Sequence, residues 1–155
     1  MATPKNPLKG TQKVANFLSI LLADESILYL KMRNAHWNVE GSDFHAMHIY
    51  FEELYTAQAT NIDEVAERIR KIDHFAPATM SEYLKLTHLT EKRGNDNNSM
   101  SYIKELNADI EAIIIYIREK LEELKKEIDQ GTEDYVNALA EQHETTAWML
   151  RSHLR

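Results

Sequence analysis

The sequence predicts an all-α protein, built as a bundle of four long helices with one long crossover connection. Apolar residues recur at the three- and four-residue spacing of a helix through most of the chain. Only four glycines and three prolines interrupt this pattern. A chain of 155 residues with 43% apolar side chains suits one globular domain. We therefore predict a single domain over residues 1–155, with residues 1–9 as an N-terminal tail.

The first two helices are joined by a short turn. The apolar pattern predicts the first helix from about Leu8 to Trp37. Gly41 and Ser42 interrupt the pattern, and the Ser42 side chain is suited to cap the next helix. The apolar stripe of the second helix ends near Arg70. Because the turn is short, the two helices are antiparallel neighbours.

The third and fourth helices form a second pair. The third helix is expected to open near Ser99 and to continue through a regular apolar pattern from Ile103 to Ile128. Gly131 then ends it as a C-terminal cap. Thr132 caps the fourth helix, which runs nearly to the C-terminus.

Residues 72–98 separate the two pairs by far more chain than a hairpin needs. A connection of this length can return along the second helix, so that the second and third helices run parallel, as in ferritin-like bundles. Within it, MSEYLKLTHL (80–89) has the pattern of a short helix, and EKRGNDNNS (91–99) has the composition of a polar loop. The predicted fold is a ferritin-like four-helix bundle whose long crossover contains a short helix.

Composition narrows the possible partners. The sequence has no cysteine, so any metal must be held by imidazole and carboxylate, which favours iron, manganese or zinc. The net charge of −7 disfavours a nucleic-acid surface over the whole fold and favours cations. No apolar run approaches the roughly 20 residues of a membrane span, and residues 1–9 lack the apolar stretch of a secretory signal. We expect a cytoplasmic protein without membrane contact.

One polar stripe on the second helix carries four possible metal ligands beside the apolar face: His48, Glu52, Asp63 and Glu67. An ordinary solvated helix face would explain the carboxylates alone. The position of His48 next to the apolar stripe argues against that explanation. Metal sites in helical bundles use such histidines and carboxylates on facing helices.

These ligands cannot all serve one metal ion in one chain, because His48 and Asp63 are separated by about 22 Å of helix. Two chains paired antiparallel about a two-fold axis would solve this, since the His48/Glu52 pair of one chain would meet the Asp63/Glu67 pair of the other. Thr56 and Ala59 would then face each other at the axis, where small side chains allow close approach. The alternative is that two common small residues occur there by coincidence.

His36 joins this site because the hairpin turn places it at the same height as His48 on the neighbouring helix. A lone histidine is usually a core or capping residue, but two histidines at matched height beside carboxylates favour a shared metal site. Of the other histidines, His143 is expected in the core and His45 on the surface, and surface or loop positions are expected for His74, His88 and His153.

Residues 34–69 contain four linked motifs. They are N-x-H-W-N-V-x-G at residues 34–41, a second histidine at His48, FEELY at residues 51–55 and NIDEVAERI at residues 61–69. Together they resemble the Dps family of mini-ferritins, the DNA-binding proteins from starved cells. The resemblance extends over four helices and nearly the whole chain.

The resemblance implies a homo-oligomer, a hollow shell of twelve subunits in which each site is shared by two subunits. It implies a ferroxidase that oxidises ferrous iron, preferentially with hydrogen peroxide rather than dioxygen, stores the ferric product and protects against oxidative damage. Glu52 stands where many relatives have aspartate, which keeps the charge and can shift the metal position slightly. The ligands carried over are His36, His48 and Glu52 of one subunit with Asp63 and Glu67 of the other.

Several roles stay open. Trp37 is either a packing residue or, as the resemblance suggests, an aromatic that quenches oxidising equivalents. A larger-ferritin oxidase is disfavoured because its two E-x-x-H ligand pairs are absent. A nucleoid protein with iron oxidation as a secondary activity remains an alternative, but Lys5, Lys9 and Lys13 offer only weak, salt-sensitive DNA binding. A purely structural helical oligomer is the third alternative.

Acidic residues at the start of the fourth helix are candidates for an iron pore around a three-fold axis. They are Asp129, Glu133 and Asp134. The alternative is ordinary acidic enrichment at a helix N-terminus, which the helix dipole already favours.

Overall fold

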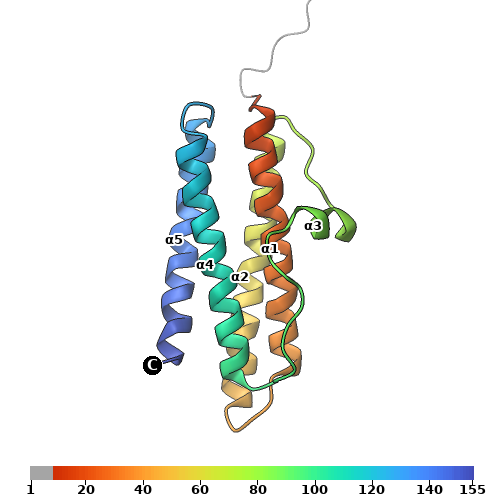
Figure 1. Ribbon diagram of the computed structural model, residues 1–155, viewed down its shortest axis with the longest axis vertical. Coiled ribbons are helices and arrows are strands. Elements are labelled where there is room, and N and C mark those ends of the chain that lie inside the picture. Colours follow the sequence, from red (N-terminus) through yellow and green to blue (C-terminus); the bar gives the residue numbers. More distant parts are fainter. Residues whose placement is uncertain (1–8) are drawn as a thin grey trace, which may run out of the picture.

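The computed structural model describes residues 9–155, which fold into a bundle of four long helices with a short fifth helix at its side (Figure 1). No β-strand is present in this part of the chain, where one isolated bridge joins Glu40 to Asn98. The predicted all-α bundle is confirmed. The helices are α1 (Gln12–Asn38), α2 (Phe44–Lys71), α3 (Met80–Leu86), α4 (Ser99–Glu123) and α5 (Gln130–His153).

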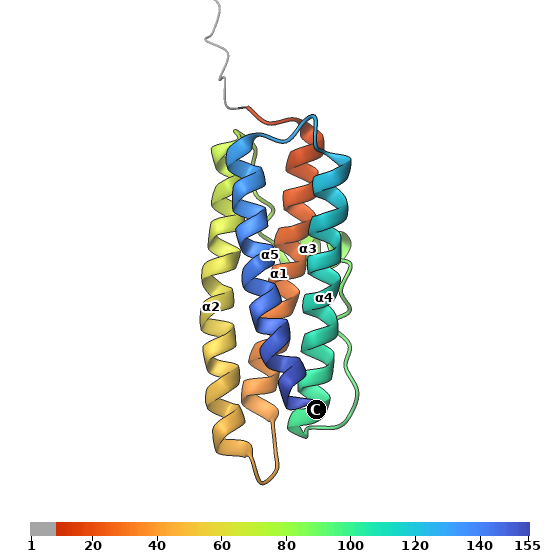
Figure 2. The same cartoon turned by 90° about the vertical axis from the view of Figure 1, so that its left-hand side faces the viewer.

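Two antiparallel hairpins make up the bundle. Residues 39–43 join α1 to α2, and residues 124–129 join α4 to α5. Between the hairpins, residues 72–98 return along the outside of α1, against which α3 packs, so α2 and α4 run parallel (Figures 1 and 2). The predicted topology, with its long crossover and short helix, is therefore confirmed.

The core lies where the four long helices face one another, and most of the apolar positions expected from the sequence are buried there. Phe44, expected on the core face of α2, is an exception and is 43% exposed. Removing this surface from water stabilises the fold by about 25 cal/mol per Å². None of the helices within residues 9–155 combines the length and apolarity that crossing a membrane requires. Fully buried core residues include Leu18, Leu21, Leu28, Phe51, Val65, Ile69, Ile110, Ile113, Ile117, Val136 and Leu150.

The first helix begins later than expected. The predicted start, Leu8, lies outside the described residues, and Lys9 and Gly10 precede the helix. Thr11 is the N-cap, because its hydroxyl accepts a hydrogen bond from the backbone N–H of Val14 at 3.3 Å.

The prediction that Ser42 caps the second helix is wrong. Asp43 occupies the N-cap position, and its carboxylate accepts a hydrogen bond from the hydroxyl of Ser99 at 2.5 Å instead of capping its own helix. The turn also needs Gly41, whose φ of 128° is strained for other residues. The start of α2 is thus tied to the start of α4.

The boundary between the last two long helices also differs from the expectation. α4 ends at Glu123, and Asp129, rather than Thr132, is the N-cap of α5. Gly131 lies in the first turn of α5 and ends no helix. A side chain there would meet the guanidinium of Arg68, 2.9 Å from the position of a Cβ atom.

The short helix of the crossover ends at Leu86, before the expected Leu89. The buried carboxylate of Asp24 in α1 accepts hydrogen bonds from the Thr87 hydroxyl at 2.6 Å and from the His88 backbone N–H at 2.7 Å. These contacts turn the chain away from the helix and fix the crossover to α1.

The first described residues are fastened to the end of α2. The backbone N–H of Gly10 donates to the carbonyl of Ile72 at 3.0 Å, and the His74 ring bonds the Gly10 carbonyl at 2.7 Å. A Cβ atom on Gly10 would lie 2.9 Å from Cδ1 and 3.1 Å from Cβ of Ile72. Only glycine fits this approach without moving the end of α2.

Gly10→Ala is therefore expected to lower the free energy of unfolding by about 1–3 kcal/mol, the usual cost of overpacking. Gly94→Ala is the matched control, because a Cβ atom there would meet only the Glu105 carboxylate, at 3.8 Å. Chemical denaturation of both variants measures the effect. Equal stability of the two variants would contradict the close approach at Gly10.

Candidate metal centre

Two histidines face each other across the α1–α2 hairpin. His36 lies in the last turn of α1 and His48 near the start of α2. Their rings are stacked, with centroids 3.8 Å apart and planes inclined by 17°. The matched height expected from the hairpin is thus realised as direct contact between the two rings.

Each ring is held by the backbone of the opposite helix. The Nδ1 atom of His36 donates to the carbonyl oxygen of His48 at 2.7 Å, and Nδ1 of His48 donates to the carbonyl oxygen of His36 at 2.7 Å. A carbonyl oxygen only accepts, so Nδ1 carries the proton in both rings. In neutral imidazoles this leaves both Nε2 lone pairs available to a metal ion.

The three candidate carboxylates lie along the exposed face of α2. Glu52 is one turn from His48, whereas Asp63 and Glu67 lie near the other end of the helix, with about 22 Å between His48 and Asp63. Within residues 9–155, no three histidine or acidic side chains lie close enough together to hold one metal ion. The structure thus brings the two histidines together and leaves the Asp63/Glu67 pair remote from them.

Between these two ends, the exposed surface of α2 carries small side chains. Thr56, Ala57, Ala59 and Thr60 are all exposed in the single chain. A second helix can approach such a surface more closely than one covered by long side chains. The middle of α2 is therefore suited to helix contact.

Aromatic rings surround the histidine pair. The ring of Tyr55 meets His36 edge-on with centroids 5.1 Å apart, and Phe44 stacks on His48 at 5.1 Å. Trp37 follows His36 directly and is 59% exposed. The tryptophan therefore contributes little to packing within its own chain.

Arg33, which sequence patterns did not single out, lies beside these rings. The guanidinium of Arg33 lies 4.2 Å from the centroid of Tyr55 and 5.7 Å from that of Trp37. Its Nε donates to the hydroxyl of Tyr29 at 2.8 Å. The helical spacing of Arg33 and Trp37 was visible in the sequence, but the position of Tyr55 depends on how α2 packs on α1.

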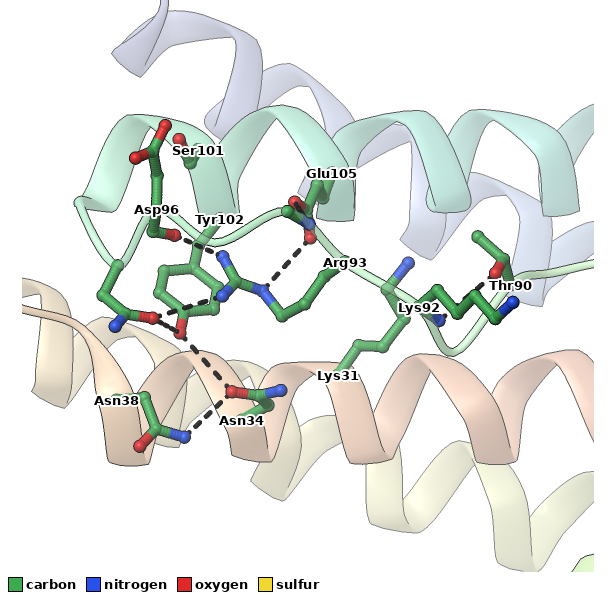
Figure 3. Close-up of polar contacts among 12 residues, drawn as sticks. Lys31, Asn34, Asn38, Thr90, Lys92, Arg93, Asp96, Ser101, Tyr102 and Glu105 are labelled. Carbon is green, nitrogen blue, oxygen red and sulfur yellow. Dashed lines mark hydrogen bonds and ion pairs between the residues drawn. The ribbon is translucent and has the colours of Figure 1, made fainter.

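The crossover braces the end of α1 that carries His36 (Figure 3). Arg93 stacks on Tyr102 at 3.8 Å and pairs with Glu105 at 3.4 Å. The Tyr102 hydroxyl contacts the Oδ1 atoms of Asn97 at 2.9 Å and of Asn34 at 3.4 Å. Residues 91–99, expected to be a polar loop, are thus held by specific contacts to α4, and through Tyr102 to α1.

The remaining five histidines lie in the core or at the surface. His143 is buried in the bundle, and His45, His88 and His153 are exposed, as expected. His74 is half-buried against Gly10. His88 contacts the buried Asp24, with 3.2 Å between Nδ1 and Oδ2.

The three acidic residues at the start of α5 differ in their contacts and exposure. Asp129 pairs with Arg68 at 2.7 Å and accepts from the backbone and the hydroxyl of Thr132. Burial raises the pKa of Asp129, but the Thr132 hydrogen bonds and the Arg68 charge outweigh it and lower that pKa overall. Glu133 is partly exposed and Asp134 is exposed at the surface.

One of the three candidate DNA-binding lysines has a partner within the fold. The Nζ atom of Lys13 lies 3.1 Å from a carboxylate oxygen of Glu127. Lys9 is exposed, and Lys5 lies outside the described residues.

Comparison with known proteins gives consistent matches in sequence. A family model described as Ferritin-like domain matches residues 15–155. The DNA protection during starvation protein 2 of Bacillus anthracis is 35% identical over 143 residues, which cover 92% of this chain and 97% of that protein. The DNA protection during starvation protein of Helicobacter pylori is 34% identical over 142 residues, covering 92% and 99%.

Solved structures agree with the sequence matches. The Dps protein of Vibrio cholerae O1, described as a member of a broad superfamily of ferritin-like diiron-carboxylate proteins, has a TM-score of 0.91 and 30% identity, covering 100% of this chain and 99% of that one. Dps from Thermosynechococcus elongatus has a TM-score of 0.87 and 29% identity, covering 93% and 91%. This chain, with its four-helix bundle, long crossover and paired histidines, belongs to the Dps family of ferritin-like proteins.

Proposed function

We propose that the protein is an iron-sequestering ferroxidase that oxidises ferrous iron, preferentially with hydrogen peroxide, and stores the ferric product in a hollow shell of twelve subunits. The histidine pair carries this proposal, because its backbone contacts leave both Nε2 atoms available to a metal ion. The diiron-carboxylate superfamily named for the Vibrio cholerae relative supports iron as the substrate. The cytoplasmic location stays a prediction.

Each oxidation site is proposed to use two chains. The His48/Glu52 pair of one chain would join the Asp63/Glu67 pair of its partner across a two-fold axis. Two observations support this arrangement: the 22 Å that separate the pairs within one helix, and the small exposed side chains between them. Each site would then have five ligands. They are His36, His48 and Glu52 of one chain with Asp63 and Glu67 of its partner.

The proposed ligands suit the substrate in both oxidation states. Imidazole binds ferrous iron well, and the three carboxylates stabilise the higher charge of the ferric product. Each ferrous ion gives up one electron, whereas hydrogen peroxide takes up two electrons and two protons to form two waters. One peroxide therefore serves two ferrous ions.

Trp37 is proposed to take up oxidising equivalents that ferrous iron does not consume. Its position directly after His36 in α1 and its 59% exposure support this role over packing within the chain.

The two-chain site makes a specific prediction. His48→Ala and Asp63→Ala should each abolish rapid peroxide-driven iron oxidation, because every site needs His48 from one chain and Asp63 from the other. After co-refolding of the two variants at equal amounts, random pairing gives about one quarter of the wild-type number of complete sites. The measurement is the rate of ferric absorbance increase, with mixed assembly confirmed by native mass.

The matched control mixes His48→Ala with Glu52→Ala. Both of these ligands come from the same chain at each site, so no mixed pair assembles a complete site and activity should stay at the level of the separate variants. Recovery in this control, or none in the first mixture once mixed assemblies are confirmed, contradicts the two-chain site.

Iron must also cross the shell, and we propose that the partly exposed carboxylate of Glu133 and the exposed carboxylate of Asp134 attract it at a pore. Asp129 was a third candidate, but its carboxylate is engaged by Arg68 and Thr132, so it contributes mainly by shaping the start of α5.

Glu133→Gln combined with Asp134→Asn should slow iron uptake several-fold while assembly mass stays unchanged. The control neutralises two exposed acidic residues elsewhere, Asp73→Asn with Glu91→Gln. Stopped-flow uptake kinetics compare the two proteins. Equal rates would remove the pore role of α5.

DNA binding remains the second candidate function, and the names of the Bacillus anthracis and Helicobacter pylori relatives favour testing it. The net charge of −7 and the pairing of Lys13 with Glu127 argue for weak binding. We expect a gel shift at low salt that disappears at physiological salt. At low salt, the Lys5→Gln/Lys9→Gln variant should give a weaker shift than the wild type. Tight binding at physiological salt would make DNA protection the main function.

A further inference from the structure

Four polar side chains lie buried inside the bundle, away from the proposed iron site. They come from three helices: Glu25 from α1, Gln58 and Asn61 from α2, and His143 from α5. Each is at most 3% exposed. Burying a carboxylate costs several kcal/mol unless it is paired, so this cluster calls for a physical explanation.

The cluster is organised around the carboxylate of Glu25. Its Oε1 atom lies 2.7 Å from Nε2 of His143, and its Oε2 atom accepts a hydrogen bond from the amide of Gln58. The same amide also donates to the backbone carbonyl of Glu25 at 3.0 Å. Asn61 in turn donates to the Gln58 carbonyl oxygen at 3.3 Å. Both oxygens of the carboxylate are thus occupied.

The spacing of these residues along their helices matches that of metal sites in four-helix bundles, but only some of the side chains are metal ligands. Bundles that hold divalent metals direct a glutamate from each of two helices, and a Glu-x-x-His pair from each of the other two, toward one point. Here Gln58 and Asn61 have that spacing on α2, and the buried Ala140 and His143 have it on α5. The carboxylate and imidazole expected on α2 are replaced by amides.

These amides change what the cluster can bind. A buried divalent cation needs anionic ligands to offset the loss of its hydration. Glu25 supplies one negative charge, and α4 supplies isoleucines to the core instead of another inward glutamate. The amide N–H of Gln58 also occupies the carboxylate oxygen that a cation would contact. Within residues 9–155, no set of three histidine and acidic side chains that could hold a metal occurs here.

We propose that Gln58 and Asn61 form an amide plug that keeps divalent cations out of the bundle centre, and that Gln58→Glu with Asn61→His opens a metal site within a single chain. The new site would combine the carboxylate and imidazole introduced on α2 with Glu25 and His143. It would bind first-row divalent ions such as Co²⁺, which mixed imidazole and carboxylate ligands suit. The inference is independent of the proposed two-chain site.

The test uses the assembled protein with His48→Ala as background, so that the proposed surface site is disabled. The Gln58→Glu/Asn61→His protein in this background should gain one tightly bound Co²⁺ per chain, detected by visible absorption and by equilibrium dialysis. Co²⁺ should also raise its melting temperature by about 5 °C. Adding His143→Gln should remove both effects, because it deletes a ligand of the new site.

Each outcome is decisive. A folded Gln58→Glu/Asn61→His protein that gains no Co²⁺ overturns the proposal, as does Co²⁺ binding by His48→Ala alone that depends on His143. If the substituted protein folds only when Co²⁺ is added, and only with His143 present, coupled folding supports the site; failure to fold with Co²⁺ counts against it. Co²⁺ binding by wild type and its loss in His48→Ala separately test the surface site.

Discussion

The two hydrogen bonds exchanged between the imidazoles of His36 and His48 and the opposite backbone set the geometry of the α1–α2 hairpin. They fix the height of one helix against the other and orient both rings. The turn at Gly41 and the Asp43–Ser99 contact close the same end. The two candidate histidine ligands are thus oriented by the fold itself, which would reduce the ordering that binding imposes.

The helices and their connections were predictable because apolar spacing is a local property of the sequence, and so was the match in height of the two histidines. Helix boundaries were less predictable because their caps depend on distant residues. Ser99 engages Asp43, and Arg68 fills the space beside Gly131. The sequence shows a possible cap but not the partner that competes for it.

The same limit applied to the surroundings of the candidate site. Arg93 and Tyr102 stack because the crossover returns to α4, and no local pattern reports such a contact. Histidine and carboxylate positions could be assigned to one stripe from helix geometry alone. Their proposed combination into one site would need a second chain, so it lies beyond what the single-chain fold determines.

Polar groups lie in two different environments in this bundle. The interior holds Glu25 with its hydrogen-bonding needs met by neighbouring side chains. The surface carboxylates of α2 remain hydrated in the single chain. A cation that approaches them loses less hydration than one that enters the core, and the negative charges there compensate it better. The arrangement of charge thus favours metal chemistry on the outside of each bundle.

The exchange of backbone and ring hydrogen bonds across the hairpin also has a consequence for proton dynamics. The Nδ1–H group of each ring donates a hydrogen bond to a backbone carbonyl of the opposite helix, with 2.7 Å between nitrogen and oxygen. Neither proton can exchange with solvent until that contact opens. The lifetimes of these two protons therefore report how often the end of the hairpin opens, and they do so in the metal-free protein.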